Sequence, residues 1–187
     1  MFGTLALDNS DLVILILICF FAGLIRGFSG FGLSAFVMSL ALTVIPPIEL
    51  IPVCWWMEFF ASVFMIKNGW RDSDKKISIM LWFGAIFGLP IGIFLTTILD
   101  FQTSKIIALV LILILASILL NNFKIKFLST EVGTISSGVF AGVATGLASI
   151  GGMIVATYVL ASQNSARRMR ASLVLYILLN SFTTFIF

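Results

Sequence analysis

Apolar runs long enough to cross a membrane as helices follow one another along the whole chain, and this feature limits the possible folds most strongly. About 20 mostly apolar residues cross the roughly 30 Å hydrocarbon core of a bilayer as a helix. Of the 187 residues, 60% are hydrophobic and 10% are charged, a ratio that water-soluble domains do not have. We therefore expect an all-α polytopic membrane protein with no soluble domain.

Polar residues, prolines and glycines divide these runs into predicted helices. They are Ile48–Ile66, Ile77–Leu99, Lys105–Leu120 and a last helix from about Ala171, and the two longer runs are Leu12–Ile45 and Thr134–Leu160. As one straight helix, the run from Leu12 to Ile45 would be about 51 Å long, more than the bilayer requires. Its glycines predict two half-helices around a break, or a re-entrant hairpin. Lys67–Lys76 reads as a polar loop.

Both long apolar runs contain the same glycine pattern. Residues 22–32 read AGLIRGFSGFG, and residues 141–151, at an offset of 119, read AGVATGLASIG. At this offset Phe60-Ala61-Ser62 also lies against Leu179-Asn180-Ser181. We interpret the chain as two repeats. Chance, or a shared need for small packing residues, is the alternative explanation.

The duplication predicts a domain organisation. The first repeat covers residues 1–121, and the second covers residues 122–187 and is incomplete. Shifting the last two helices of the first repeat by 119 places their counterparts at roughly 196 to 239. We therefore expect the C-terminal part of the second repeat to be missing.

Basic residues indicate how the chain crosses the membrane, because Lys and Arg accumulate on the cytoplasmic side. Nine of the eleven lie in three segments, 67–76, 124–126 and 167–170. These segments fall on one face if each glycine-containing run returns the chain to the side from which it entered. The N-terminus and Asp100 then lie on the other face, and the two repeats are inverted, as in many secondary transporters.

Three further glycines predict a helix contact. Gly84, Gly88 and Gly92 follow at intervals of four residues and share one helix face. Another helix can approach closely there.

Two broken helices at membrane depth predict a polar cavity, because unpaired backbone groups there must be buried in protein or face water. Helices that resume after Gly32 and Gly152 present free N–H groups and a positive dipole end, which suit anions. Arg26 adds a positive charge, and Ser29 and Ser149 add hydroxyls. In the alternative, the glycines only allow close packing and Arg26 snorkels to a headgroup.

Two other polar residues stand inside predicted helices. Glu58 is costly at the bilayer centre, so it either pairs with Arg26 or is protonated and carries a coupling proton. A static hydrogen bond between helices is the simpler alternative, and it applies equally to Asn180. We predict a substrate site at the following residues, with Glu58 as the proton-coupling candidate: Arg26, Gly27, Ser29, Gly30, Phe31, Gly32, Ser149, Gly151, Gly152 and Asn180.

Several classes of protein find no support in the sequence. His is absent, and Cys19 and Cys54 stand alone in apolar runs, so the sequence predicts no metal site, cofactor or catalytic constellation and no enzyme. The net charge of +3 arises from short loops and does not indicate nucleic acid. The expected partners are a small anion and membrane lipid, and a homo-oligomer is a further option.

The glycine motifs resemble a known family. The stretch Gly23–Gly32, its counterpart Ser149–Gly152 and the loop Asn68–Asp72 are similar to the sulfite exporter TauE/SafE family over essentially the whole chain. The resemblance implies a multi-pass permease of the bacterial plasma (inner) membrane with seven to nine helices in two repeats. It also implies that the two glycine motifs form the substrate region.

The leading hypothesis is therefore a secondary transporter for small anions, such as sulfite, sulfonates or other sulfur-containing organic anions. The alternative is a non-transporting membrane subunit or assembly factor that binds partner helices through its small-residue faces.

Overall fold

The fold is a bundle of α-helices. The computed structural model describes residues 9–42, 45–121, 130–161 and 165–186. In this part of the chain the helices are α1 (Asn9–Ser29), α2 (Leu33–Ala41), α3 (Pro47–Asp72), α4 (Lys75–Ile98), α5 (Phe101–Asn121), α6 (Glu131–Ala148), α7 (Gly151–Ala161) and α8 (Ala166–Ile186). Five of them, α1, α3, α4, α5 and α8, are long and apolar enough to cross a membrane. The expectation of an all-α polytopic membrane protein is confirmed.

Each glycine-containing run is broken, but the break lies later than expected. Helix α1 continues through Arg26 to Ser29 and is 21 residues long, so the prediction of two half-helices is wrong for its first part. Gly30 and Gly32 then take φ angles of +85° and +87°, which end the helix, and α2 has only nine residues. The second run likewise consists of α6, a turn at Ser149 with φ of +57°, and the shorter α7.

Two predicted helix boundaries differ most from the structure. Helix α3 does not end at Ile66 but continues to Asp72, so the predicted loop from Lys67 is mostly helical. Helix α8 begins at Ala166 rather than near Ala171, so the three arginines lie in its first turns. Hydropathy marks where the chain leaves hydrocarbon, whereas Lys and Arg are good helix formers that let a helix continue beyond it.

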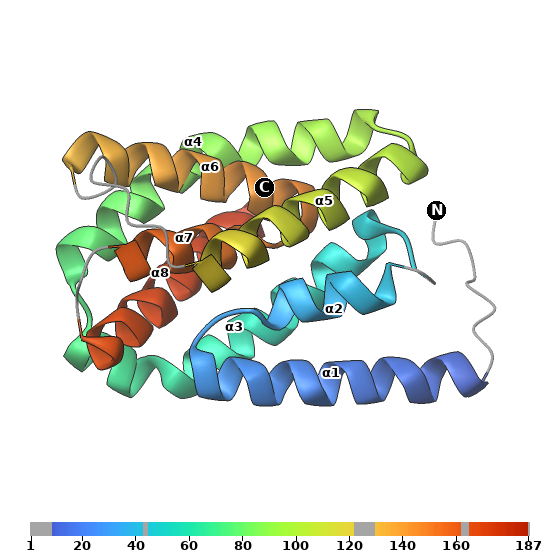
Figure 1. Ribbon diagram of the computed structural model, residues 1–187, viewed down its shortest axis with the longest axis horizontal. Coiled ribbons are helices and arrows are strands. Elements are labelled where there is room, and N and C mark those ends of the chain that lie inside the picture. Colours follow the sequence, from blue (N-terminus) through green and yellow to red (C-terminus); the bar gives the residue numbers. More distant parts are fainter. Residues whose placement is uncertain (1–8, 43–44, 122–129, 162–164, 187) are drawn as a thin grey trace.

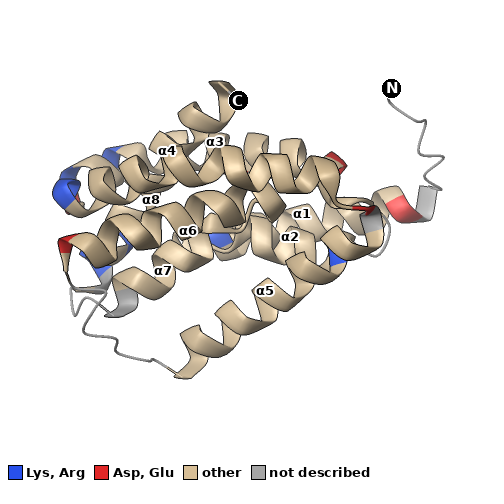
Figure 2. Cartoon of the chain, turned by 90° about the horizontal axis from the view of Figure 1, so that it is seen from above, with Lys and Arg blue, Asp and Glu red and all other residues tan. Residues whose placement is uncertain are grey.

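The two broken units enter the bundle from opposite ends. The start of α1 and the end of α2 lie near one end, whereas the start of α6 and the end of α7 lie near the other (Figure 1). Basic residues gather where α3 ends and where α4 and α8 begin, and we call this the basic end (Figure 2). Lys124 and Lys126 lie outside the described residues. Internal duplication, its inversion and the two domain boundaries stay predictions.

Helices α4 and α6 make the closest contact in the bundle, and glycine makes it possible. A Cβ atom on Gly84, Gly88 or Gly92 would overlap backbone atoms of Ile135, Val139 or Val143 on α6. The reverse holds for the α6 glycines, which face the α4 backbone, namely Gly138, Gly142 and Gly146. The predicted packing role of the α4 glycines is confirmed, and the contact joins the two predicted repeats.

A single methyl group should disturb this contact. We expect Gly88→Ala to destabilise the protein by about 1–3 kcal/mol, because its Cβ overlaps the Val139 carbonyl oxygen and forces α4 and α6 apart. The midpoint of thermal unfolding in detergent measures the effect. Gly23→Ala is the matched control, since no atom lies within 4 Å of the Cβ position there. Equal unfolding midpoints for the two variants would contradict the packing role.

Candidate functional site

Arg26 and Glu58 form an ion pair inside the bundle. Arg26, on α1, is fully buried, and its Nε lies 2.9 Å from Glu58 Oε2 on α3. Arg26 Nη2 donates a hydrogen bond of 2.7 Å to Ser62 Oγ, one turn after Glu58 on the same helix face. Arg26 therefore does not snorkel to a headgroup, and the predicted pairing with Glu58 is confirmed.

The same carboxylate contacts the start of the short helix α2. Glu58 Oε1 accepts hydrogen bonds from Ser34 Oγ at 3.0 Å and from Ser34 N at 3.4 Å. The first amides of a helix have no intrahelical partner and form its positive dipole end. Sequence reasoning assigned this end to a substrate anion, but an anion of the protein itself lies there in this structure.

A small cavity lies where α3, α6, α7 and α8 meet, and we call it the central cavity. Its volume is about 30 Å³, room for about two water molecules. It is lined by Trp55, Glu58, Thr145, Ser149, Gly152, Tyr176, Ile177, Asn180, Ser181 and Thr184. Asn180 is 7% exposed, and its Oδ1 has no hydrogen-bond partner among the described residues. The central cavity therefore offers a buried polar atom that no protein group satisfies.

The second break directs the start of α7 toward this cavity. Helix α6 ends at Ala148, the N–H of the next residue, Ser149, donates to the Thr145 carbonyl at 2.7 Å, and α7 starts at Gly151. Gly152 and Ser149 both line the cavity. The positive dipole end of α7 therefore faces it from one side, while Glu58 faces it from another.

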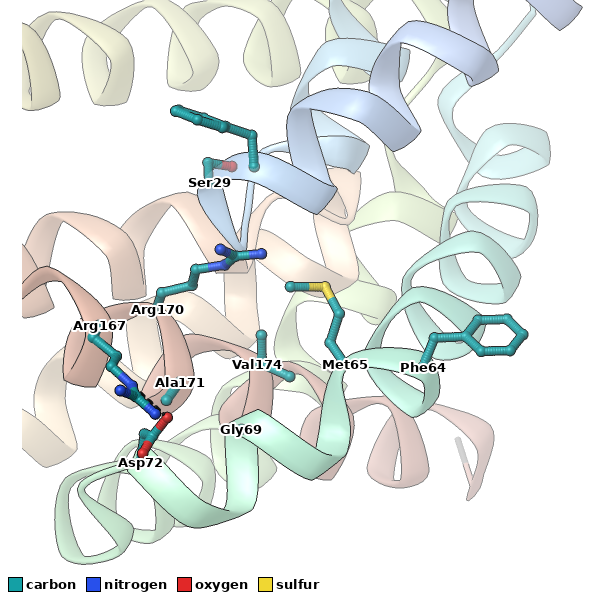
Figure 3. A pocket seen from close by; sticks show the side chains of 10 residues that line it. Ser29, Phe64, Met65, Gly69, Asp72, Arg167, Arg170, Ala171 and Val174 are labelled. Atoms are coloured by element: carbon teal, nitrogen blue, oxygen red, sulfur yellow. Dashed lines mark hydrogen bonds and ion pairs between the residues drawn. The ribbon is translucent and has the colours of Figure 1, made fainter.

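A larger cavity of about 670 Å³ lies at the basic end, and we call it the basic vestibule (Figure 3). Arg167 and Arg170 of α8 line it together with Asp72. Arg167 Nε lies 2.7 Å from Asp72 Oδ2, and Arg170 Nη2 donates a hydrogen bond to the Gly27 carbonyl. The guanidinium of Arg170 thus binds the last turn of α1, where helix carbonyls lack partners.

The predicted site residues fall into three groups. Those at or next to the central cavity are Arg26, Glu58, Ser149, Gly152 and Asn180. Those at the basic vestibule are Ser29, which lines it, and Gly27 and Gly30, which contact Arg170. Those with packing or backbone roles are Phe31, Gly32 and Gly151. The sequence-predicted set is therefore not one site.

The backbone explains why some glycines fall outside the central cavity. A Cβ on Gly30 would lie 2.6 Å from Arg170 Cγ, so glycine makes room for the arginine stem. A Cβ on Gly151 would overlap the Ala141 carbonyl, so this glycine lets α7 pack against α6. Ser29 Oγ lies 2.8 Å from the Ile25 carbonyl oxygen and 2.6 Å from the Phe31 carbonyl oxygen, so its hydroxyl proton has an acceptor on either side of the first break.

Sequence reasoning missed five polar contributors: Ser34, Ser62, Thr145, Arg170 and Tyr176. The repeat contained a signal for one of them, because Thr145 lies at the position that matches Arg26 at the offset of 119. Asn180 Nδ2 lies 3.5 Å from Thr145 Oγ1, as Ser62 lies beside Arg26. Arg26 and Thr145 thus both contact a polar side chain of the second helix after the break, which is α3 for Arg26 and α8 for Thr145.

The effects of removing Arg26 and Glu58 on stability should not be additive, because the two charges form one ion pair. We expect Arg26→Met alone to destabilise the protein by about 3–5 kcal/mol, because it leaves the buried Glu58 carboxylate unpaired. Adding Glu58→Gln should recover part of the loss, because both charges are then gone. Thermal unfolding of the two single variants and the double variant, in one detergent, gives the coupling.

The surface pair supplies the control. Arg167→Met breaks an ion pair whose arginine side chain is 74% exposed, so it should lower the free energy of unfolding by about 1 kcal/mol or less.

If the Arg26→Met/Glu58→Gln double variant lost the sum of the two single effects, Arg26 and Glu58 would not stabilise each other.

The described residues contain no cluster of three or more His, Cys, Asp or Glu side chains that could hold a metal ion. The polar atoms that converge at the middle of the bundle are instead suited to hydrogen bonding and charge pairing.

Comparison with known proteins identifies the family. Neither a curated protein nor a solved structure gives a significant match to the chain. The family described as "Sulfite exporter TauE/SafE" matches residues 15–187, which is nearly the whole sequence. Together with the five apolar spans, this match shows that the chain belongs to the TauE/SafE family of membrane transporters.

Proposed function

We propose that the protein carries small organic or inorganic sulfur oxyanions across the plasma (inner) membrane, with the central cavity as the midpoint of the route. The single observation that carries this proposal is the convergence of the α7 dipole end, Ser149 and Asn180 on a polar cavity beside the Arg26–Glu58 pair. By the positive-inside rule, the basic end faces the cytoplasm.

The ion pair supports a way to couple anion and proton. Glu58 Oε2 lies 2.9 Å from Arg26 Nε, so the carboxylate and the guanidinium neutralise each other. A substrate anion next to Glu58 would be repelled at close range in a medium of low dielectric constant. Protonation of Glu58 removes this repulsion and frees the Arg26 charge for the anion. Anion and proton then bind together and cross together.

Cavity sizes support an occluded arrangement. The central cavity holds about two water molecules, whereas sulfite has four non-hydrogen atoms. The basic vestibule, at about 670 Å³, is large enough for a hydrated anion. The contact between Arg170 and the Gly27 carbonyl lies at its wall, where the vestibule approaches the first break. Substrate entry therefore requires α8 to shift relative to α1.

The alternative function, a subunit that binds partner helices through small-residue faces, has less support on α4. The glycines of α4 pack against α6 of the same chain, so this face is not available for a partner helix.

Anion flux tests the proposal. Methanesulfonate is a suitable probe, because it stays a monoanion across the useful pH range. Protein reconstituted in liposomes should take it up faster as the pH falls, since a protonated Glu58 frees Arg26. Glu58→Gln should give a rate that no longer depends on pH. Arg26→Met should lower the rate about tenfold or more, through the lost charged hydrogen bonds.

Lys76→Gln is the control, because Lys76 pairs with Glu131 at the surface, at 2.5 Å, and its side chain is 72% exposed. It should leave both the rate and its pH dependence unchanged. An Arg26→Met protein that is folded and transports at the wild-type rate would remove Arg26 from the route. A Glu58→Gln protein with the wild-type pH profile would remove proton coupling through Glu58.

A further inference from the structure

A third cavity, of about 410 Å³, opens at the bundle half away from the basic end, between α3, α4 and α8. We call it the outer cavity. Its walls are mainly apolar and aromatic and include Ile51, Pro52, Trp55, Ile93, Thr184 and Phe185. Trp55 and Thr184 also line the central cavity, so the two cavities share a wall. A ligand that reaches across this wall would contact both.

The threonine hydroxyl groups in the outer cavity already have acceptors within the protein. Thr97 Oγ1 donates to the Phe94 carbonyl at 2.8 Å, and Thr184 Oγ1 donates to the Asn180 carbonyl at 2.9 Å. Thr96 Oγ1 lies 2.9 Å from the Gly146 carbonyl. These hydroxyl protons are therefore not offered to a ligand. The outer cavity suits an apolar group, because an oxyanion there would lose its water without replacement.

The central cavity has the opposite character. It contains the free Oδ1 of Asn180, a carboxylate and the start of α7. A polar compartment and an apolar compartment thus adjoin at Trp55, whose Nε1 donates to the Ser181 carbonyl at 2.9 Å. Its ring stacks against Phe59 and Phe185, each with a centroid distance of 5.6 Å. These contacts hold the indole ring as part of a wall on the apolar side.

We propose that the outer cavity is a subsite for the apolar body of an organic anion whose compact oxyanion head occupies the central cavity. This inference rests on the proposed function and narrows its substrate class from small oxyanions to amphiphilic ones. An apolar cavity of about 150 Å³ is enough to bind benzene, so the outer cavity accommodates a ring or a short alkyl chain. Aromatic walls favour a ring through stacking and edge contacts.

Competition between anions with the same head tests the substrate class. Uptake of labelled methanesulfonate into liposomes is measured against unlabelled benzenesulfonate and unlabelled methanesulfonate. Both carry one sulfonate group, so the difference reports the body of the anion. We expect benzenesulfonate to compete about tenfold or more better, which is the range that apolar subsites give for small differences in substrate size. Equal or weaker competition by benzenesulfonate overturns the proposal.

Two neighbouring substitutions on α4 locate the subsite. Thr97→Phe fills part of the outer cavity and should abolish the preference for benzenesulfonate while methanesulfonate uptake continues. Ile98→Phe places the same ring one residue further on, at a side chain that is 61% exposed and does not line the cavity. It should keep the preference. Continued methanesulfonate uptake shows that each variant is folded.

The outcomes separate this inference from the proposed function. Methanesulfonate uptake without a preference for benzenesulfonate rejects the subsite and leaves the transport proposal standing. A preference that survives Thr97→Phe also rejects the subsite in the outer cavity. No uptake of methanesulfonate or sulfite by wild-type protein rejects both proposals.

Discussion

The Arg26–Glu58 ion pair is the interaction on which the centre of this protein depends. Each charge alone would be costly at membrane depth. The carboxylate is shared, because one oxygen faces Arg26 and the other accepts hydrogen bonds from Ser34 at the start of α2. Glu58 of α3 therefore stabilises both a buried arginine and a backbone N–H at the start of α2, and it joins α1, α2 and α3 into one unit.

The two breaks resemble each other in sequence and differ in chemistry. Arg26 precedes the first break, and the matching position before the second is Thr145, which has no charge. The first helix start is occupied by Glu58, whereas the second faces the central cavity through Ser149 and Gly152. Similar backbone geometry thus gives two helix starts with different surroundings. The positive dipole end of α2 is neutralised by Glu58, whereas that of α7 faces the central cavity. This asymmetry supports a single midpoint for transport over two equivalent sites.

Sequence predicted the helical membrane fold and the two breaks, and it offered the Arg26–Glu58 pairing as one of several alternatives, because each follows from the cost of polar groups in hydrocarbon. It misplaced the ends of α3 and α8, because helices continue into water where hydropathy has already fallen. It also missed Ser34 and Tyr176, since hydroxyl groups are tolerated in membrane helices and give no signal until packing brings them together. Gly27, Gly30 and Gly151 were assigned to a substrate site, although their neighbours show roles at the Arg170 contact and in packing.

The packing limits which helices can move when the central cavity widens. Helices α4 and α6 meet through interleaved glycines and backbone, so sliding one past the other would drive carbonyls into Cα atoms. Side chains instead form two contacts of α8 with its neighbours: Trp55 with Ser181 at the central cavity, and Arg170 with Gly27 at the basic vestibule. Both contacts include α8, and a rotamer change can break either one without breaking a helix. A widening of the cavity therefore involves α8 moving against α1 and α3, while the α4–α6 pair stays fixed.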